Sequence, residues 1–90
     1  MSYSVTGIEP TPNPNAVKFM LDRPISEGTV SFLSPESAQD HPLARRLFGV
    51  EGVTSVLLLG DFVTVNKTAK AAWPAIKRKV QQILSEPHAS

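Results

Sequence analysis

The segment spanning residues 53–67 constrains the fold more than any other part of the chain. It contains two stretches of alternating apolar residues joined by Gly60-Asp61. Glycine in the first position of a two-residue hairpin loop is typical of a type II′ turn, which needs a positive φ there. Because the turn fixes the register of the hairpin, four cross-strand pairs follow from it. The expected pairs are Leu59 with Phe62, Leu58 with Val63, Leu57 with Thr64, and Val56 with Val65.

The side chains of this hairpin divide into two sets, because successive residues of a strand point to opposite faces of a sheet. One set is entirely aliphatic and is predicted to face helices. The other set is mixed, as expected for a half-exposed face. The aliphatic set is Val56, Leu58, Val63 and Val65, and the mixed set is Ser55, Leu57, Leu59, Phe62, Thr64 and Asn66.

A second constraint is a loop rich in proline and asparagine that precedes an alternating stretch over residues 16–21. Its residues are Thr11, Pro12, Asn13, Pro14 and Asn15. The prolines fix their own φ and disfavour helix at the residues before them, while the asparagine side chains can bond to nearby backbone N–H groups. We interpret the loop as a rigid structural support that leads into the strand at residues 16–21. Its rigidity would also suit a preformed recognition loop.

The remaining strands are predicted over residues 3–9 and over 29–33, with Asp22-Arg23-Pro24 ending the strand at 16–21. Ser34 followed by Pro35 is typical of a turn or a helix N-terminus. These stretches add two strands to the three already described.

Two main helices are expected. The first begins at Asp40-His41-Pro42, with Asp40 as its cap, and Gly49 is predicted to end it in a left-handed conformation. The second runs from about Ala71 to Ser85, with Pro74 in its first turn, because proline is tolerated there. Apolar residues recur along it at helical spacing. They are Trp73, Ile76, Val80, Ile83 and Leu84.

Together these elements predict an α+β fold, a two-layer sandwich in which an antiparallel β-sheet carries two main helices packed on one face. A chain of 90 residues has room for one such domain, with its core over about residues 3–85. The order of the strands does not follow from the sequence.

Five stretches in order along the chain carry a resemblance to a known family. Residues 11–19 (TPNPNAVKF) resemble the TPNPNALKF motif that opens the N-terminal domain of the Nfu family, the NifU-like iron–sulfur cluster scaffold proteins. PLARRLF at 42–48 is similar to that domain's PLAKRLF helix, VEGV at 50–53 to its IEGV turn, and DFVTVNK at 61–67 to its DFITVTK strand. Trp73 stands where the family's last helix opens. The resemblance covers roughly residues 8–85.

The chain contains no cysteine. Thiolate-bound zinc or iron–sulfur clusters, disulfides and thiol catalysis are therefore excluded within one chain. In the Nfu family the cluster ligands are a Cys-x-x-Cys pair in a separate C-terminal domain, which we expect this chain to lack. The resemblance thus implies a stand-alone accessory module without cofactor, whose partners are iron–sulfur assembly factors or recipient apoproteins.

The composition favours a folded chain, with 41% hydrophobic and 19% charged residues. No apolar run reaches the ~18 residues of a membrane helix. The first residues lack the features of a secretory signal or an organelle transit peptide, so we expect a cytoplasmic location. Nothing in the sequence indicates the oligomeric state.

Catalytic and metal sites are not indicated. Asp40-His41 is the only neighbouring acid–histidine pair, and capping explains Asp40 better than a catalytic relay. No phosphate-binding glycine loop or metalloprotease motif occurs. Four carboxylates in one loop-rich stretch leave a weak iron-binding protein as an alternative. They are Asp22, Glu27, Glu36 and Asp40.

Charge is distributed unevenly. Residues 1–61 hold four basic and seven acidic residues, a net charge of −3, whereas residues 62–90 hold five basic residues and one acidic residue, a net charge of +4. A nucleic-acid accessory protein that uses the basic C-terminal helix is a second alternative. It is not favoured, because no aromatic residues are interleaved with the cations and the pI is about 8.1.

Protein binding is the function that the sequence favours. The helix-free face of a two-layer sheet can carry an apolar patch, and such patches mark partner surfaces. We predict that Met20, Leu57, Leu59 and Phe62 lie there together, with Arg45 and Arg46 supplying charged hydrogen bonds at the rim. Strand order, a dimer mate or the N-terminal segment decides whether these residues form one exposed patch.

Overall fold

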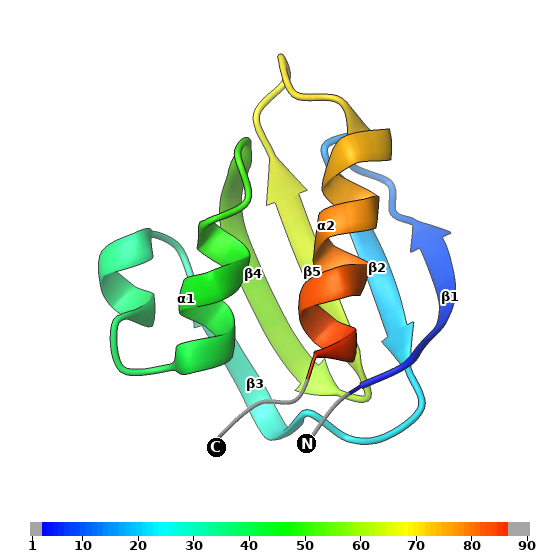
Figure 1. The fold of residues 1–90 in the computed structure, drawn as a ribbon, viewed down its shortest axis with the longest axis vertical. Coiled ribbons are helices and arrows are strands. Elements are labelled where there is room, and N and C mark those ends of the chain that lie inside the picture. The colour runs from blue at the N-terminus through cyan, green and yellow to red at the C-terminus, as the bar shows by residue number, and fades with distance from the viewer. Residues whose placement is uncertain (1–2, 87–90) are drawn as a thin grey trace.

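The computed structural model describes residues 3–86, which form a five-stranded antiparallel sheet with all helical segments on one side (Figure 1). The predicted two-layer α+β fold is confirmed. The strands are β1 (Val5–Pro10), β2 (Ala16–Leu21), β3 (Ser26–Phe32), β4 (Val53–Gly60) and β5 (Phe62–Lys67). The helical segments are η1 (Pro35–Ala38), α1 (Pro42–Phe48) and α2 (Trp73–Ser85).

The strands lie in the order β1-β2-β5-β4-β3, so the β4–β5 hairpin occupies the middle of the sheet together with β2. All four predicted hairpin pairs are confirmed, from Leu59 opposite Phe62 to Val56 opposite Val65. Gly60 has a φ of 58°, and Asp61 has no positive φ. A positive φ at the first loop position alone fits the expected type II′ turn.

The core lies between the sheet and the helices. The four aliphatic side chains of the hairpin that were predicted to face helices are at most 1% exposed. They pack with Phe19 of β2, Leu47 of α1 and Val80 of α2, each 0% exposed. Burial of side chains of this size contributes roughly 1.5–3 kcal/mol each, so this contact contributes strongly to the stability of the fold.

Two expectations about α1 are wrong. The N-cap is His41, whose Nδ1 accepts a hydrogen bond from the Ala44 N–H at 3.1 Å, because Pro42 is the first helical residue and Asp40 therefore lies one position too early. Gly49 is right-handed, with a φ of −70°, and its N–H bonds to the Arg45 and Arg46 carbonyls. The chain turns instead at Gly52, where φ is 96°.

Other boundaries shift by a few residues. β1 starts and ends slightly later than predicted, β3 begins at Ser26 rather than at Thr29, and α2 begins at Trp73 rather than near Ala71. Ser34 is the N-cap of the segment that follows it, as expected for a helix N-terminus, and this segment, η1, is a short 3₁₀ helix. Within residues 3–86, no helix is long and apolar enough to cross a membrane.

Substituting alanine at three glycines tests the backbone conformation of this structure. Gly60→Ala places a side chain at a positive φ but in open space, so we expect a loss of about 1–2 kcal/mol of unfolding free energy. Gly52→Ala should lose more, because its Cβ would lie 2.6 Å from the Ala71 Cβ. Gly28→Ala, with open space and no positive φ, should change stability by less than about 0.5 kcal/mol. Urea unfolding measures all three, and equal losses for Gly52→Ala and Gly60→Ala would contradict this structure.

Candidate interaction surfaces

The side of the sheet without helices, here called the open face, carries an apolar cluster at its centre. Met20 of β2 lies opposite Phe62 of β5, which lies opposite Leu59 of β4, so the three form one row across adjacent strands. Leu57 lies in the neighbouring row, opposite Thr64. The strand order therefore brings together the four apolar residues singled out from the sequence. All four are partly exposed.

Charged residues border this cluster. Lys18 pairs with Thr64 in the row that contains Leu57, and its Nζ lies 4.8 Å from the centroid of the Phe62 ring. On the far side of Lys18, the exposed Glu9 pairs with it from β1. An apolar centre with a polar rim is the usual anatomy of a protein–protein interface. The arrangement can bury an apolar partner surface and orient it by charge.

Arg45 and Arg46 lie on the other side of the sheet. They belong to α1, whose Leu43, Ala44 and Leu47 are buried in the core. Both arginines are exposed, and Arg46 forms an ion pair with Glu86 at 2.7 Å. The sheet thus separates them from the apolar cluster, so one flat contact surface cannot include both sets as we expected. Whether either set binds a partner stays a prediction.

The proline- and asparagine-rich loop is held by its own side chains. The Thr11 hydroxyl lies 2.9 Å from the Asn13 carbonyl oxygen and 3.0 Å from the Ala16 carbonyl oxygen, and it accepts a hydrogen bond from the Asn13 N–H at 3.1 Å. The Asn15 N–H donates to the Asn13 side-chain oxygen at 2.9 Å. Between them, Pro12 and Pro14 are exposed. The loop therefore has a fixed shape before any partner arrives.

Two residues from distant stretches anchor this loop. Lys67, at the end of β5, donates through Nζ to the Asn15 side-chain oxygen at 3.1 Å and through its backbone N–H to the Asn15 carbonyl at 2.9 Å. The Trp73 indole N–H donates to the Pro14 carbonyl at 3.1 Å. The Lys67 Nζ also lies 5.5 Å from the Trp73 ring centroid. Sequence reasoning missed this junction, although Lys67 and Trp73 stand in two of the five motif stretches.

The carboxylates do not gather into a metal site. Within residues 3–86, no three histidine or acidic side chains lie close enough together to hold a metal ion. Glu27 lies on β3, whereas Glu36 lies in η1. Nor do Asp40 and His41 form a relay, because the His41 Nδ1 is occupied by the Ala44 N–H and its ring packs edge-on against Phe32.

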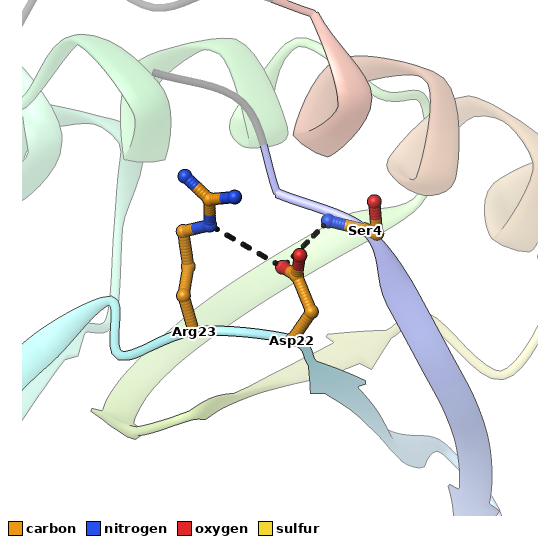
Figure 2. Close-up of polar contacts among 3 residues, drawn as sticks. All are labelled: Ser4, Asp22 and Arg23. Atoms are coloured by element: carbon orange, nitrogen blue, oxygen red, sulfur yellow. Dashed lines mark hydrogen bonds and ion pairs between the residues drawn. The ribbon is translucent and has the colours of Figure 1, made fainter.

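Asp22 instead ties the N-terminal segment to the end of β2 (Figure 2). Its carboxylate accepts a hydrogen bond from the Ser4 N–H at 3.0 Å, and Arg23 Nε lies 3.5 Å from the same oxygen. The Asp22 N–H donates in turn to the Ser4 carbonyl. The hydrogen bond from Ser4, assisted by the Arg23 charge, holds the pKa of the Asp22 carboxyl below its ordinary value.

Comparison with known proteins identifies a family that shares these motifs and this fold. Residues 5–90 match the family model described as "Scaffold protein Nfu/NifU N terminal". The human protein named NFU1 iron-sulfur cluster scaffold homolog, mitochondrial, is 38% identical over 90 residues, which cover 98% of this chain and 35% of that protein. NifU-like protein 5, mitochondrial, from Arabidopsis thaliana is 33% identical over 81 residues, which cover 89% of this chain and 30% of that protein.

Two solved structures have a fold similar to that of this chain. The crystal structure of protein SAV1430 from Staphylococcus aureus has a TM-score of 0.75 at 26% identity, covering 89% of this chain and 96% of that one. The solution structure of the NifU-like protein from Saccharomyces cerevisiae has a TM-score of 0.74 at 28% identity, and the match covers 89% of this chain and 76% of that one.

A two-layer α+β domain with this loop, hairpin and closing helix defines an Nfu-type N-terminal domain. The chain belongs to the Nfu/NifU scaffold family. It spans about a third of the length of the curated relatives it matches.

Replacing Thr11 by valine tests the loop. The change keeps the branched shape but removes the hydroxyl that serves Asn13 and Ala16, so we expect a loss of about 1–2 kcal/mol in urea unfolding and faster amide exchange at Asn13. Thr6→Val is the matched control, since its exposed hydroxyl makes no hydrogen bond within the described residues. Equal stability of the two variants would show that the loop does not depend on this network.

Acid should release the Asp22 contact. Because its pKa is lowered in the folded chain, its ionised form stabilises the fold above the ordinary value of 3.8, and this stabilisation is lost as the pH falls through the lower folded value. We expect the Asp22 carboxyl to titrate below an aspartate in a short peptide, and the Ser4 amide shift to follow the same curve in NMR. A pKa of the Asp22 carboxyl equal to or above that of the aspartate in the short peptide would show that the contact with Ser4 does not stabilise the ionised form.

Proposed function

We propose that this domain is a non-enzymatic protein-interaction module that assists iron–sulfur cluster assembly or delivery without ligating a cluster itself. The family supports a role related to cluster assembly. The observation that carries the finer proposal is the open face, where Met20, Leu57, Leu59 and Phe62 lie together without a covering helix.

The open face has the chemistry of a docking surface. Its central residue is Phe62, and aromatic side chains are enriched among the residues that dominate binding energy at interfaces. Phe62 is flanked on both sides in its row by long apolar side chains, Met20 and Leu59, and the Lys18 ammonium lies over its ring. The partner we propose is an iron–sulfur assembly factor or a recipient apoprotein that presents an apolar surface.

The chemistry of the side chains supports the non-ligating part of the proposal. Iron–sulfur clusters in proteins are held chiefly by cysteine thiolates, and this sequence has none. The residues offered for a carboxylate iron site are scattered over the fold, and Asp22 already serves Ser4 and Arg23. No observation favours weak iron binding over the interaction role.

The location of the protein belongs to the proposal as well. The sequence leads us to expect the cytoplasm, while the human and Arabidopsis relatives carry names that describe them as mitochondrial. Cell fractionation followed by immunoblotting of the native protein tests this part.

The open face can be tested by affinity capture from native extract followed by mass spectrometry. Leu57→Asp places a charge in the apolar cluster, and we expect it to reduce recovery of iron–sulfur assembly proteins or their clients by about tenfold or more, because an unpaired charge would be buried on binding. Leu57 is partly exposed in the free domain, so the variant should still fold, and circular dichroism checks this.

Arg45→Glu is the matched control on the opposite side of the sheet. It changes the net charge by more than Leu57→Asp does, yet it should leave recovery unchanged. If Arg45→Glu abolished recovery of the partners and Leu57→Asp did not, the contact would lie on the helix layer, and the proposal would be wrong.

A further inference from the structure

Helix α2 carries three consecutive cations, Lys77, Arg78 and Lys79. Lys77 and Arg78 lie in α2, on the side of the sheet where β1 forms the edge, whereas Glu27 and Glu36 lie in β3 and η1 at the other edge (Figure 1). Within residues 62–86 the only acidic residue is Glu86. Its carboxylate forms an ion pair with Arg46 of α1 rather than with a cation of α2.

A groove between α2 and the start of β1 contains two of these cations. Its α2 wall is formed mainly by Lys77, Arg78, Gln81 and Gln82, and its β1 wall by Ser4 and Val5. No acidic residue lines it. Among residues 3–86, neither Lys77 nor Arg78 forms an ion pair. The lining therefore carries two positive charges, with donors from ammonium, guanidinium, amide and hydroxyl groups, while the Asp22 carboxylate beside Ser4 is already bonded to the Ser4 N–H and paired with Arg23.

The β1 wall of this groove is fixed in place. The Tyr3 N–H donates to the Leu84 carbonyl near the end of α2 at 2.7 Å. The neighbouring Ser4 N–H donates to the Asp22 carboxylate (Figure 2), and the Ser4 carbonyl accepts a hydrogen bond from the Asp22 N–H. These bonds join the N-terminal segment to both α2 and β2, so the groove exists before a ligand binds, which lowers the cost of binding.

We infer that this groove binds an acidic segment of a protein partner. Glutamate or aspartate side chains of the segment would accept charge-assisted hydrogen bonds from Lys77 and Arg78. The Gln81 and Gln82 amides, each with donors and an acceptor, match the backbone of an extended peptide. Val5, on the β1 wall, offers an apolar contact.

A protein segment fits these residues better than nucleic acid does. Single-stranded nucleic acid is bound by cations spaced along a channel together with aromatic platforms for the bases. This groove has only two cations and no aromatic lining residue. The surface is also distinct from the open face, so the inference goes beyond the function proposed above and its test does not depend on that function.

The test uses the 90-residue chain and a short fluorescein-labelled peptide of glutamates interrupted by leucines. The same peptide with glutamine in place of glutamate is the neutral probe, and an oligothymidylate of similar length is the nucleic-acid probe. At low salt we expect the acidic peptide to bind more tightly than both other probes. Amide shifts in NMR should concentrate at Ser4, Val5 and residues 77–82.

Two double variants with the same change in net charge separate the groove from general charge attraction. Lys77→Glu/Arg78→Glu should weaken binding by about tenfold or more, and Lys70→Glu/Lys79→Glu, outside the groove, by less than about threefold. Equal losses for the two variants, tighter binding of the oligonucleotide, or no binding of the acidic peptide would each overturn the inference. None of these results bears on capture through the open face.

Discussion

The contact between the aliphatic side of the β4–β5 hairpin and the two helices governs the rest of the structure. Val56, Leu58, Val63 and Val65 are at most 1% exposed, and they fix which side of the sheet α1 and α2 cover. Because side chains alternate along a strand, burying this set commits Leu57, Leu59 and Phe62 to the other side. The same burial that stabilises the fold therefore creates the open face.

The sheet then separates two surfaces of different chemistry. The open face has an apolar centre with a charged rim, whereas the groove beside α2 is polar and positive. A partner docked on the open face, as we propose, would therefore leave the groove free for an acidic segment.

Local patterns in the sequence predicted much of this fold. The glycine turn fixed the hairpin register, and alternation located β2 to the residue. The strand order could not be read, because pairing of β2 with β5 joins residues far apart in the chain. For the same reason, the sequence could not show that Lys67 and Trp73 contact the loop at residues 11–15. Nor could it show that Arg45 lies across the sheet from Leu57. The N-cap of α1 differs from the expected one, because Pro42 is the first helical residue and His41, not Asp40, therefore holds the cap position.

Site-specific photo-crosslinking in the cell can show whether the open face touches an iron–sulfur assembly protein, as we propose. A photoreactive phenylalanine analogue placed at Phe62 keeps an aromatic ring at the centre of the cluster, and the same analogue at Arg45 samples the helix layer. We expect the Phe62 position, and not the Arg45 position, to crosslink to an iron–sulfur assembly factor or recipient apoprotein. Crosslinks to such proteins from Arg45 alone, or none from Phe62, would overturn the proposal that the open face is the contact surface.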